Sequence, residues 1–469
     1  MECYDTDTYA GFKYLLWEIV FEMYQDLRDY LNALDARGEL KVVEKDVSVE
    51  YEIAAYIRKS SDLNGPAFLF NNVRNYPGWR FAAGLYCTLS KLTVALECEA
   101  RDIAKKYRNA ITNPIEPRIV SSAAFKEKVI KFEDVNLYDL PICKHSEGDS
   151  GKFITSAVAF AKDPDTSVLQ LGIHRHELKG KNTLGLWAPG EKRVGRAFLK
   201  AEERGEALQV ALVIGNDPAV DLASQAKIPH SVSKIGVAGG LRGSPVELAK
   251  CETIDVEVPA RSEVVIECEA VPGYREREGP FGEITGTYSG GKEAPVLKVK
   301  AICMRRNPIF TTFLTGMPKT DNHYMAMPAM MEVVYRYASI ACPEVKAVNL
   351  TGNGYYTALV SIKKRMEGEP YNVMAAVLGS IYQTKYCYVF DDDIDVFNPD
   401  DCEWAFQTRF QPAQDTHIFN FMVGAPLDPS APLDRHTSKM GFDCTIPLSE
   451  RDSGKYRRVK VPGVENVNW

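Results

Sequence analysis

Two glutamates flank a short corner in the sequence Glu278-Gly279-Pro280-Phe281-Gly282-Glu283. Proline restricts φ and glycine permits positive φ, so this corner is able to turn both carboxylates toward one cavity. Carboxyl groups held close together in a partly dry site have pKa values that move apart, and one of them then keeps a proton near neutral pH. The corner is therefore a candidate general acid. A solvated loop with two surface glutamates is the simpler alternative.

Segment 168–176 contains a second group of polar residues: Gln170, His174, Arg175 and His176. On a strand, the two histidines face the same way and Arg175 faces the opposite way. Arg175 is then able to hold a carboxylate or a phosphate through two parallel hydrogen bonds. The histidine pair is a weak candidate for a metal site, because no third ligand is evident nearby.

Basic residues and glycines form a third group, at Lys192, Arg193, Lys234 and 239–243. These residues are candidates for holding a phosphate, although the glycine spacing matches neither a Walker A loop nor a dinucleotide-binding fingerprint. The acidic run 391–395 resembles a Mg²⁺-binding segment. A solvated strand end before a helix start explains that run more simply.

Composition excludes several classes of protein. The chain has 469 residues, of which 45% are hydrophobic and 25% charged, and a net charge of −7. This mixture is typical of globular domains, and the length favours two or three of them. A chain this acidic has no global attraction for nucleic acid or anionic membranes. The 11 cysteines are scattered, without a C-x-x-C pair, which favours reduced thiols in a cytoplasmic protein over disulfides or a zinc ribbon.

Hydrophobic periodicity predicts the elements that position these residues. The first third predicts helices over 25–37 and 49–60 and a strand over 67–71, a mixed α/β domain that ends near 113–117. The middle third predicts a β-barrel or sandwich with helices at 194–204 and 218–226. Its expected strands are 153–161, 168–175, 210–214, 253–258, 263–268 and 296–304.

The last third predicts a small α/β domain. We expect its first helix to run from Pro328 to Ala341, because proline suits the first helical position. The other expected elements are strands over 347–350, 357–362 and 386–389 and helices over 371–380 and 399–408. Residues after about Gln411 show little periodicity and many prolines. They predict an extended tail that packs on a neighbouring domain or subunit.

The N-terminal residues 1–24 predict an amphipathic helix. The apolar stretch 9–24 is interrupted by Lys13, Glu18 and Glu22, so it cannot span a bilayer, which needs about 20 apolar residues. The first residues also lack the basic segment of a signal peptide. We expect this helix to dock on the body of the protein or on a neighbouring subunit.

Several motifs in order resemble the UbiD family of decarboxylases. The resemblance covers about 26–444 and rests on the stretches 65–67, 243–247, 250–253, 258–260, 262–263, 278–283, 391–395 and 408–409, with Phe70 and Trp404. It implies an N-terminal α/β domain (25–120), a central split β-barrel of flavin-reductase type (121–318) and a C-terminal α/β domain with an extended tail (319–469). Residues 1–24 form an extension outside it.

The resemblance also implies a reaction: the reversible, non-oxidative removal of CO2 from an aromatic, possibly hydroxy-aromatic, or α,β-unsaturated acid. The cofactor is prenylated FMN, supplied by a flavin prenyltransferase, and the enzyme is a homodimer or higher homo-oligomer. Arg175 and Glu278 match the family's catalytic positions, and Glu283 matches its proton donor. His323 matches a substrate-facing histidine that accepts a phenol proton. A surface histidine before a helix is the alternative.

The resemblance implies a set of cofactor-binding positions, and three of them carry residues that differ from those usual in the family. The set consists of Gln170, Leu171, Gly172, Ile173, His174, Arg175, Lys192, Arg193 and Lys234. Family members commonly hold the cofactor phosphate through a divalent metal such as Mn, bound by Asn, His and Glu. Those three positions are Gln170, Arg193 and Lys234 here, and protonated Arg and Lys are not metal ligands. We therefore expect no metal and a phosphate held by the cations, unless Glu191 or Glu252 supplies a ligand.

A different class of function is also compatible with this departure. The chain could be a non-catalytic or cofactor-free subunit of a multisubunit aryl carboxylase complex, which would explain both the altered phosphate positions and the N-terminal extension. The complete set of Arg175, Glu278 and Glu283 favours the enzyme. The content of bound flavin discriminates between the two.

Deletion of residues 1–24 tests the predicted extension helix. We expect a folded protein with a lower melting temperature or a changed assembly, because the apolar face loses its contacts. The residues of that face are Leu15, Leu16, Ile19, Val20 and Met23. Thermal denaturation and gel filtration make the comparison with the full chain. An unchanged melting temperature together with an unchanged oligomer size would contradict the prediction.

Overall fold

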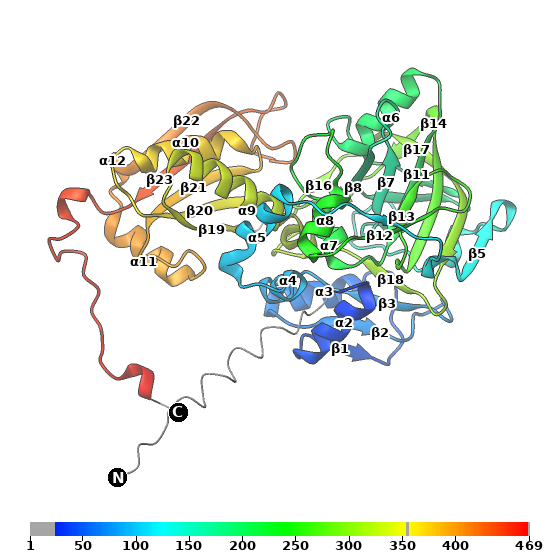
Figure 1. Cartoon of the computed structure of the whole chain (residues 1–469), viewed down its shortest axis with the longest axis horizontal. Helices are drawn as coiled ribbons and strands as arrows, with labels where there is room; N and C mark the ends of the chain where they lie inside the picture. The colour runs from blue at the N-terminus through cyan, green and yellow to red at the C-terminus, as the bar shows by residue number, and fades with distance from the viewer. Residues whose placement is uncertain (1–23, 353–355, 468–469) are drawn as a thin grey trace, which may run out of the picture.

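The computed structural model describes residues 24–352 and 356–467, which form three regions, each built around its own sheet (Figure 1). The helix expected over residues 1–24 lies outside the described residues, except for Tyr24, whose hydroxyl donates to the carbonyl of Val94 at 2.9 Å. The mixed α/β fold class expected from the sequence is confirmed.

The N-terminal region is a four-stranded sheet with helices. Its strand order is β1-β2-β3-β18, and β18 pairs in parallel with β3 although it comes from far along the chain. The sheet consists of β1 (Leu40–Val43), β2 (Ala67–Phe70), β3 (Arg80–Ala83) and β18 (Ile309–Thr312). The helices are α2 (Leu27–Ala36), α3 (Glu52–Leu63), α4 (Leu89–Leu96) and α5 (Ile103–Thr112). Asp26 caps α2, because its carboxylate accepts from the backbone amides of Arg28 and Asp29.

The central region is a curled half-barrel sheet of nine strands in the order β6-β9-β10-β17-β14-β11-β7-β8, with β5 beside β17. The two long strands β14 and β17 pair antiparallel along its middle, with bulges that bend the sheet. The strands are β5 (Lys128–Lys131), β6 (Phe153–Ile154), β7 (Val158–Lys162), β8 (Leu169–Ile173), β9 (His176–Gly180), β10 (Thr183–Gly185), β11 (Leu208–Ile214), β14 (Val264–Glu278) and β17 (Lys292–Met304).

Smaller elements surround this sheet. The hairpin β15 (Phe281–Gly282) and β16 (Tyr288–Ser289) follows β14, and a three-stranded sheet consists of β4 (Arg118–Ile119), β12 (Glu247–Lys250) and β13 (Glu257–Pro259). Three helices belong here: α6 (Arg193–Glu203), α7 (Pro218–Ala223) and α8 (Lys234–Arg242). Both α6 and α8 pack on β8, so their first residues lie close to that strand.

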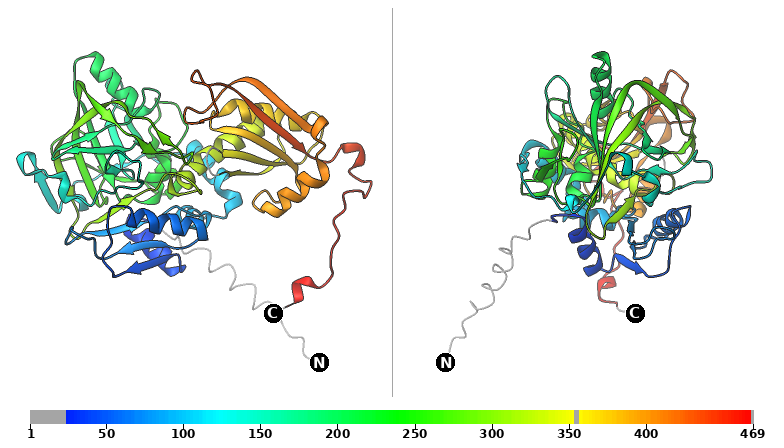
Figure 2. Two further views of the ribbon diagram at one scale, coloured as in Figure 1. Left: turned by 180° about the vertical axis from the view of Figure 1, so that it is seen from behind. Right: turned by 90° about the vertical axis from the view of Figure 1, so that its right-hand side faces the viewer.

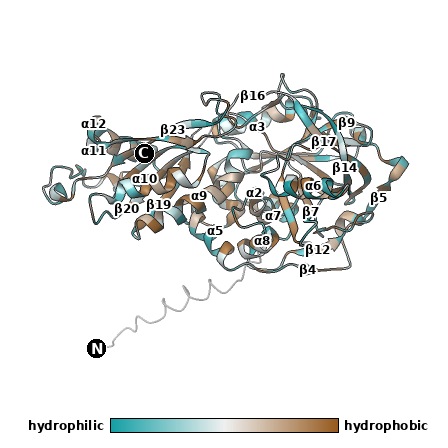
Figure 3. Cartoon of the chain, turned by 90° about the horizontal axis from the view of Figure 1, so that it is seen from above, coloured by the Kyte–Doolittle hydropathy of each residue, from teal (hydrophilic) through white to brown (hydrophobic). Residues whose placement is uncertain are grey.

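The C-terminal region is a five-stranded sheet in the order β19-β20-β21-β23-β22. Its strands are β19 (Val345–Thr351), β20 (Tyr356–Ile362), β21 (Thr384–Asp391), β22 (Thr416–Val423) and β23 (His436–Cys444). Its helices are α9 (Asp321–Ala341), α10 (Glu369–Ser380), α11 (Pro399–Arg409) and α12 (Pro412–Asp415). Helix α9 packs on both α10 and α5, so it joins this region to the rest of the molecule (Figure 2). Figure 3 shows α9 near the middle of the molecule, and many of its residues are buried.

Two expectations for the last third are wrong. Helix α9 begins at Asp321 and contains Pro328 in its interior, because Thr320 caps the helix and His323 completes the capping box. The residues after Gln411 are not only a tail, since β22 and β23 extend the sheet and β23 pairs with β21. The tail is limited to the residues after β23 (Figure 1).

Three expectations for the middle third also need correction. The strand expected over 153–161 is interrupted between β6 and β7, and the strand expected over 253–258 is mostly a turn. Buried Glu267 holds that turn by accepting from the backbone amides of Glu252 and Thr253, both at 2.6 Å. The glycines near 239–243 lie in helix α8, where a Cβ on Gly239 would be 2.3 Å from the carbonyl oxygen of Ile115. These glycines therefore permit close packing.

None of the helices in the described part of the chain combines the length and the apolar character that crossing a membrane requires.

A buried carboxylate joins the N-terminal and central regions. Glu263 is fully buried just before β14 and accepts from Arg28 of α2 at 2.7 and 3.0 Å. It also accepts from Arg305 at 3.1 Å and from the backbone amide of Ile309 in β18 at 3.0 Å. A buried carboxylate requires such partners, and its partners in turn depend on it.

Replacing Glu263 with alanine should lower the free energy of unfolding by about 3–5 kcal/mol, because two guanidinium groups and one amide lose their acceptor. The matched control is Glu269→Ala, which removes a half-buried pair with Lys300 (2.8 Å) from the nearby strand β14. We expect that control to cost about 1 kcal/mol or less. Chemical denaturation measures both, and equal losses would contradict the role assigned to Glu263.

Candidate active site

Arg175 lies between β8 and β9, where a single bridge to Trp187 holds its backbone. Its guanidinium lies 5.2 Å from the ring centre of Trp187 and 4.9 Å from that of Phe281. Only 8% of its side chain is exposed. A buried arginine of this kind needs acceptors on every edge of the guanidinium, and the glutamate corner supplies them.

The two glutamates of the corner both contact Arg175, but in different ways. Glu278 is fully buried, and its two oxygens accept from Nε and Nη2 of Arg175, both at 2.7 Å. Glu283 uses one oxygen to accept from Nη1 of Arg175, and Nη1 also donates to Ser289 at 3.2 Å. Burial alone would lower the pKa of Arg175, but the hydrogen bond to Glu278 and the charges of both glutamates outweigh burial and raise it.

Two acidic residues that the sequence analysis did not single out hold the corner in place. Glu177 of β9 accepts from the backbone amide of Gly279 at 3.0 Å, and Asp149 accepts from that of Gly282 at 2.9 Å. Gly279 has φ of +83°, a conformation that favours glycine. Glu177 lies two residues after Arg175 along the chain. This spacing was the only local sign in the sequence that Glu177 contributes to the site.

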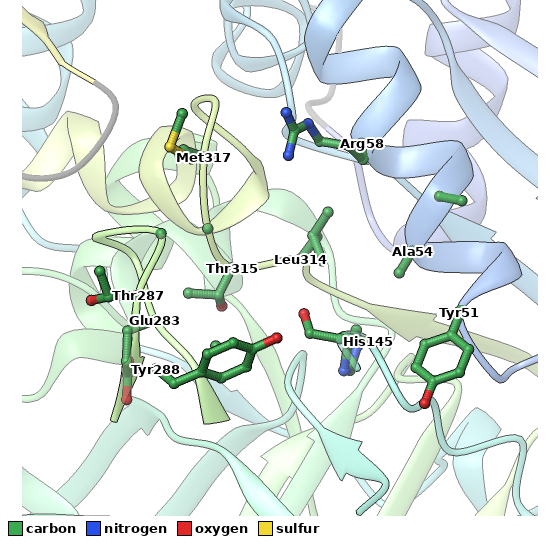
Figure 4. Close-up of a pocket in the computed structure, with 15 residues that line it drawn as sticks. Tyr51, Ala54, Arg58, His145, Glu283, Thr287, Tyr288, Leu314, Thr315 and Met317 are labelled. Carbon is green, nitrogen blue, oxygen red and sulfur yellow. The ribbon is translucent and has the colours of Figure 1, made fainter. Parts of the chain in front are cut away.

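A cavity of about 370 Å³ lies beside Glu283. Figure 4 shows Glu283, Thr287 and Tyr288 on one side and Ala54 and Arg58 of α3 on the other. Its floor includes His145, whose Nε2 lies 2.6 Å from the hydroxyl of Thr312. Burial lowers the pKa of His145 to about 4, so this ring is neutral near pH 7. The remaining lining residues are Tyr51, Ala55, Ser146, Gly282, Gly286, Leu314, Thr315, Gly316 and Met317.

The structure does not place His323 in the wall of this cavity. Its side chain is fully buried in the first turn of α9, so the alternative of a surface histidine is wrong. Its Nδ1 accepts from the backbone amide of Thr320 at 3.3 Å, and its ring lies edge-on to Tyr356 at 6.4 Å. These contacts give His323 a part in capping α9.

The other candidate residues gather around β8. Gln170 and Leu171 are buried within the strand, Gly172 and Ile173 complete it, and His174 follows it. Arg193 is the first residue of α6, and Nη1 of its guanidinium donates to Oε1 of Gln170 at 2.9 Å. His174 and His176 are both buried, and burial lowers the pKa of His176 to about 4.

The residues at the three metal-ligand positions do not fit a divalent ion. Arg193 offers only N–H donors, and Lys234 donates from Nζ to the carbonyl of Ser224. Glu252 is not available to help, because it pairs with Lys126 at 3.2 Å and Lys131 at 2.8 Å. Within the part of the chain that the structure describes, no group of three or more His, Cys, Asp or Glu side chains could hold a metal.

Comparison with characterised proteins gives consistent relatives. The chain is 34% identical to the phenolic acid decarboxylase of Bacillus subtilis (strain 168), with 95% of this chain and 98% of that protein covered. It is also 34% identical to the anhydromevalonate phosphate decarboxylase of Methanothermobacter thermautotrophicus, with 91% and 99% covered.

Solved structures agree with these relatives. The UbiD-class enzyme HmfF from Pelotomaculum thermopropionicum, in complex with FMN, superposes with a TM-score of 0.88 at 37% identity, covering 94% of this chain and 99% of that one. An evolved dimeric form of HmfF in complex with prFMN superposes with a TM-score of 0.85 at 36% identity, covering 95% and 99%.

The sequence also matches all three domains of one family. They are the N-terminal, Rift-related and C-terminal domains of 3-octaprenyl-4-hydroxybenzoate carboxy-lyase (UbiD), over residues 31–111, 118–318 and 323–444. Because these matches cover most of the chain in the family's own order, the protein belongs to the UbiD family of carboxy-lyases.

Proposed function

We propose that this protein is a reversible, non-oxidative decarboxylase of an aromatic or α,β-unsaturated carboxylic acid that uses prenylated FMN. The observation that carries the proposal is the buried Arg175, which binds Glu278 and Glu283 at the edge of a cavity. Relatives named as phenolic acid decarboxylases, and neighbours solved with FMN and prFMN, support the substrate class and the cofactor.

The residues around β8 fit the flavin. In strand β8, Gln170 and Leu171 are buried and Gly172 and Ile173 are half-buried, and cationic side chains at the starts of α6 and α8 suit a phosphate. When bound, prenylated FMN supplies an electron sink for the electron pair released as the bond to the carboxylate breaks. A flavin prenyltransferase would supply this cofactor.

Arg175 and Glu278 position the reacting groups. The double hydrogen bond fixes the plane of the guanidinium, so Nη1 points in one direction only. Nη1 then orients Glu283 and, in the complex, the carboxylate of the substrate. Holding groups in place in this way removes much of the entropic cost of reaching the transition state.

Glu283 delivers the proton. The substrate loses CO2 and must gain one proton at the same carbon, so the reaction needs an acid at the cavity. Glu278 is fully buried with both oxygens bound to Arg175, whereas Glu283 lines the cavity and binds Arg175 through one oxygen. Glu283 is therefore the residue that can reach the substrate, and solvent protonates it again after each turnover.

The cavity suits a planar, mostly apolar acid. Its volume of about 370 Å³ falls within the range of small-molecule sites, and Leu314 and Met317 contribute apolar surface to its wall. Arg58 offers a cation at the rim, where it also pairs with Asp62 at 3.0 Å. The task of accepting a phenol proton remains a prediction for His323, which the described cavity does not include.

Reconstitution with prenylated FMN tests the proposal directly. The loaded protein should release CO2 from aromatic or conjugated acids and should exchange the resulting C–H hydrogen with deuterium from solvent. Chromatography of a substrate panel and mass spectrometry measure both. A protein that binds no flavin and catalyses neither reaction would be the cofactor-free subunit considered above.

Replacing Glu283 with glutamine should lower turnover by at least about 10²–10⁴-fold, because the amide cannot donate a carboxylic proton. The fold and the bound flavin should persist, since glutamine has nearly the same shape. Glu276→Gln is the matched control, because that residue lies on β14 outside the cavity, where it accepts from Tyr274 at 2.5 Å. Near wild-type CO2 release or deuterium exchange by the Glu283 variant would refute its role.

Replacing Arg175 with lysine keeps the positive charge and removes the double hydrogen bond. We expect kcat to fall about 10²-fold, since small displacements of catalytic groups have effects of this size. The exposed neighbour Arg277→Lys provides the control. A change in KM alone, with kcat unaltered, would show that the double hydrogen bond between Arg175 and Glu278 does not affect the chemical step.

A further inference from the structure

Positive charges without acidic partners gather at one end of β8. Lys192 precedes α6, Lys234 begins α8, and Lys227 lies in the segment between α7 and α8. The charges of Lys192 and Lys227 both act on Lys234, so the three amines lie near one another. Within residues 24–352 and 356–467, the charges that shift the pKa values of Lys227 and Lys234 are all positive.

The lowered pKa values of Lys227 and Lys234 show that their positive charges are unfavourable in this environment. Burial, followed by the charge of Arg193 and those of the two lysines, lowers the pKa of Lys234 well below its usual value. Burial and Lys192 lower the pKa of Lys227 to about 8. Asp163 is the nearby carboxylate whose charge reaches His230, but Lys200 already binds it at 2.7 Å. Like charges packed together in a region of low polarity call for an anion to compensate them.

A buried histidine gives an independent sign of a ligand. His174, which is 9% exposed, has an Nε2 atom for which the described residues supply no hydrogen-bond partner. The charges of His176, Lys192 and Lys234 all act on its ring. Burial lowers its pKa to about 3, which leaves a neutral imidazole whose other nitrogen bonds the backbone of Trp187, so Nε2 is an unused acceptor.

Arg193 stands apart from the lysines because its guanidinium is already bound. Nη1 donates to Oε1 of Gln170 and to the carbonyl of Val232, both at 2.9 Å. Nη2 donates to the carbonyls of Ile228 at 2.8 Å and Pro229 at 2.5 Å. Four oxygens therefore surround one cation, which is the kind of environment that oxygen ligands give a metal ion.

We propose that Lys192, Lys227 and Lys234 bind the phosphate of the flavin directly, and that Arg193 is a built-in cation that replaces the divalent ion. This inference rests on the flavin of the proposed function. The phosphate rather than another anion is favoured because two helices begin at the cluster, and because β8 connects the cluster to Arg175.

The contacts of Arg193 and of the lysines indicate different roles for them. Arg193 holds the segment 228–232 against Gln170, which positions Lys227 at one end of that segment and Lys234 just beyond the other. The lysines, whose amines are less engaged, are then available for the phosphate oxygens. Binding a dianion would also offset the mutual repulsion of the lysines and raise the pKa values of Lys227 and Lys234.

Affinities for FMN and riboflavin, which differ only in the phosphate, test the proposal on the purified apoprotein. Quenching of flavin fluorescence should show FMN bound more tightly than riboflavin, with the same affinity before and after exhaustive chelation. Lys234→Met and Lys227→Met should each weaken FMN binding by about 10–100-fold and leave riboflavin binding unchanged, the range expected for a lost charge-assisted hydrogen bond.

Lys439→Met is the matched control. Lys439 is also buried, burial lowers its pKa to about 8, and it donates to the carbonyls of Leu378 at 2.7 Å and Ile381 at 2.8 Å. It lies in β23, in another region of the protein, so its loss should change stability without changing the preference for FMN over riboflavin. Melting temperatures of all variants separate misfolding from lost binding.

Elemental analysis of the FMN-loaded protein completes the test. A divalent metal in proportion to flavin, with both lost together in chelator, would overturn the proposal even if the enzyme decarboxylates its substrate. Equal affinity for FMN and riboflavin, with stabilisation by inorganic phosphate, would assign the cluster to a phosphate on the substrate instead and would also overturn it. Chelator-resistant, lysine-dependent FMN binding by a protein without decarboxylase activity would support the phosphate site and refute the proposed function.

Discussion

The central constraint on this structure is the burial of the Arg175 guanidinium. A charge removed from water needs compensation, and the double hydrogen bond to Glu278, with further bonds to Glu283 and Ser289, provides it. These partners come from the end of β14 and the hairpin that follows it, so the junction of β8 and β9 must lie against that corner. The curl of the central sheet brings the two segments together, and the cavity forms beside them.

The same principle explains the contrast between Arg175 and the lysine cluster, both of which lie near β8. At Arg175, the fold supplies acceptors for every edge of the cation. At the cluster of Lys192, Lys227 and Lys234, it supplies none that carry a negative charge in the described residues. A fold that compensates Glu263, Glu267 and Arg175 so completely has no general difficulty in pairing buried charges. The missing partners are therefore best understood as belonging to a ligand.

The sequence contained enough local information to predict the family, the fold class and the candidate residues Arg175, Glu278 and Glu283. It did not reveal Glu177 or Asp149, because their roles depend on contacts with a corner more than a hundred residues away. Local rules also failed where tertiary packing overrides them. Pro328 lies inside α9 because the cap at Thr320 fixes the helix start, and β23 forms because β21 and β22 pair with it.

The packing of α8 bears most directly on function. Its glycines allow the helix to approach residues 113–115, and the helix packs on β8, so its first residue, Lys234, lies beside that strand. A helix start places a side chain more rigidly than a loop does, and rigidity matters where lysine amines must converge despite their repulsion. A metal ion can bind flexible ligands by its own attraction, whereas a cluster of cations must be held by the fold before any anion arrives. Two independent sets of contacts hold the cluster in place. One is the set of four oxygens that accept from Arg193, and the other is the close packing of the α8 glycines.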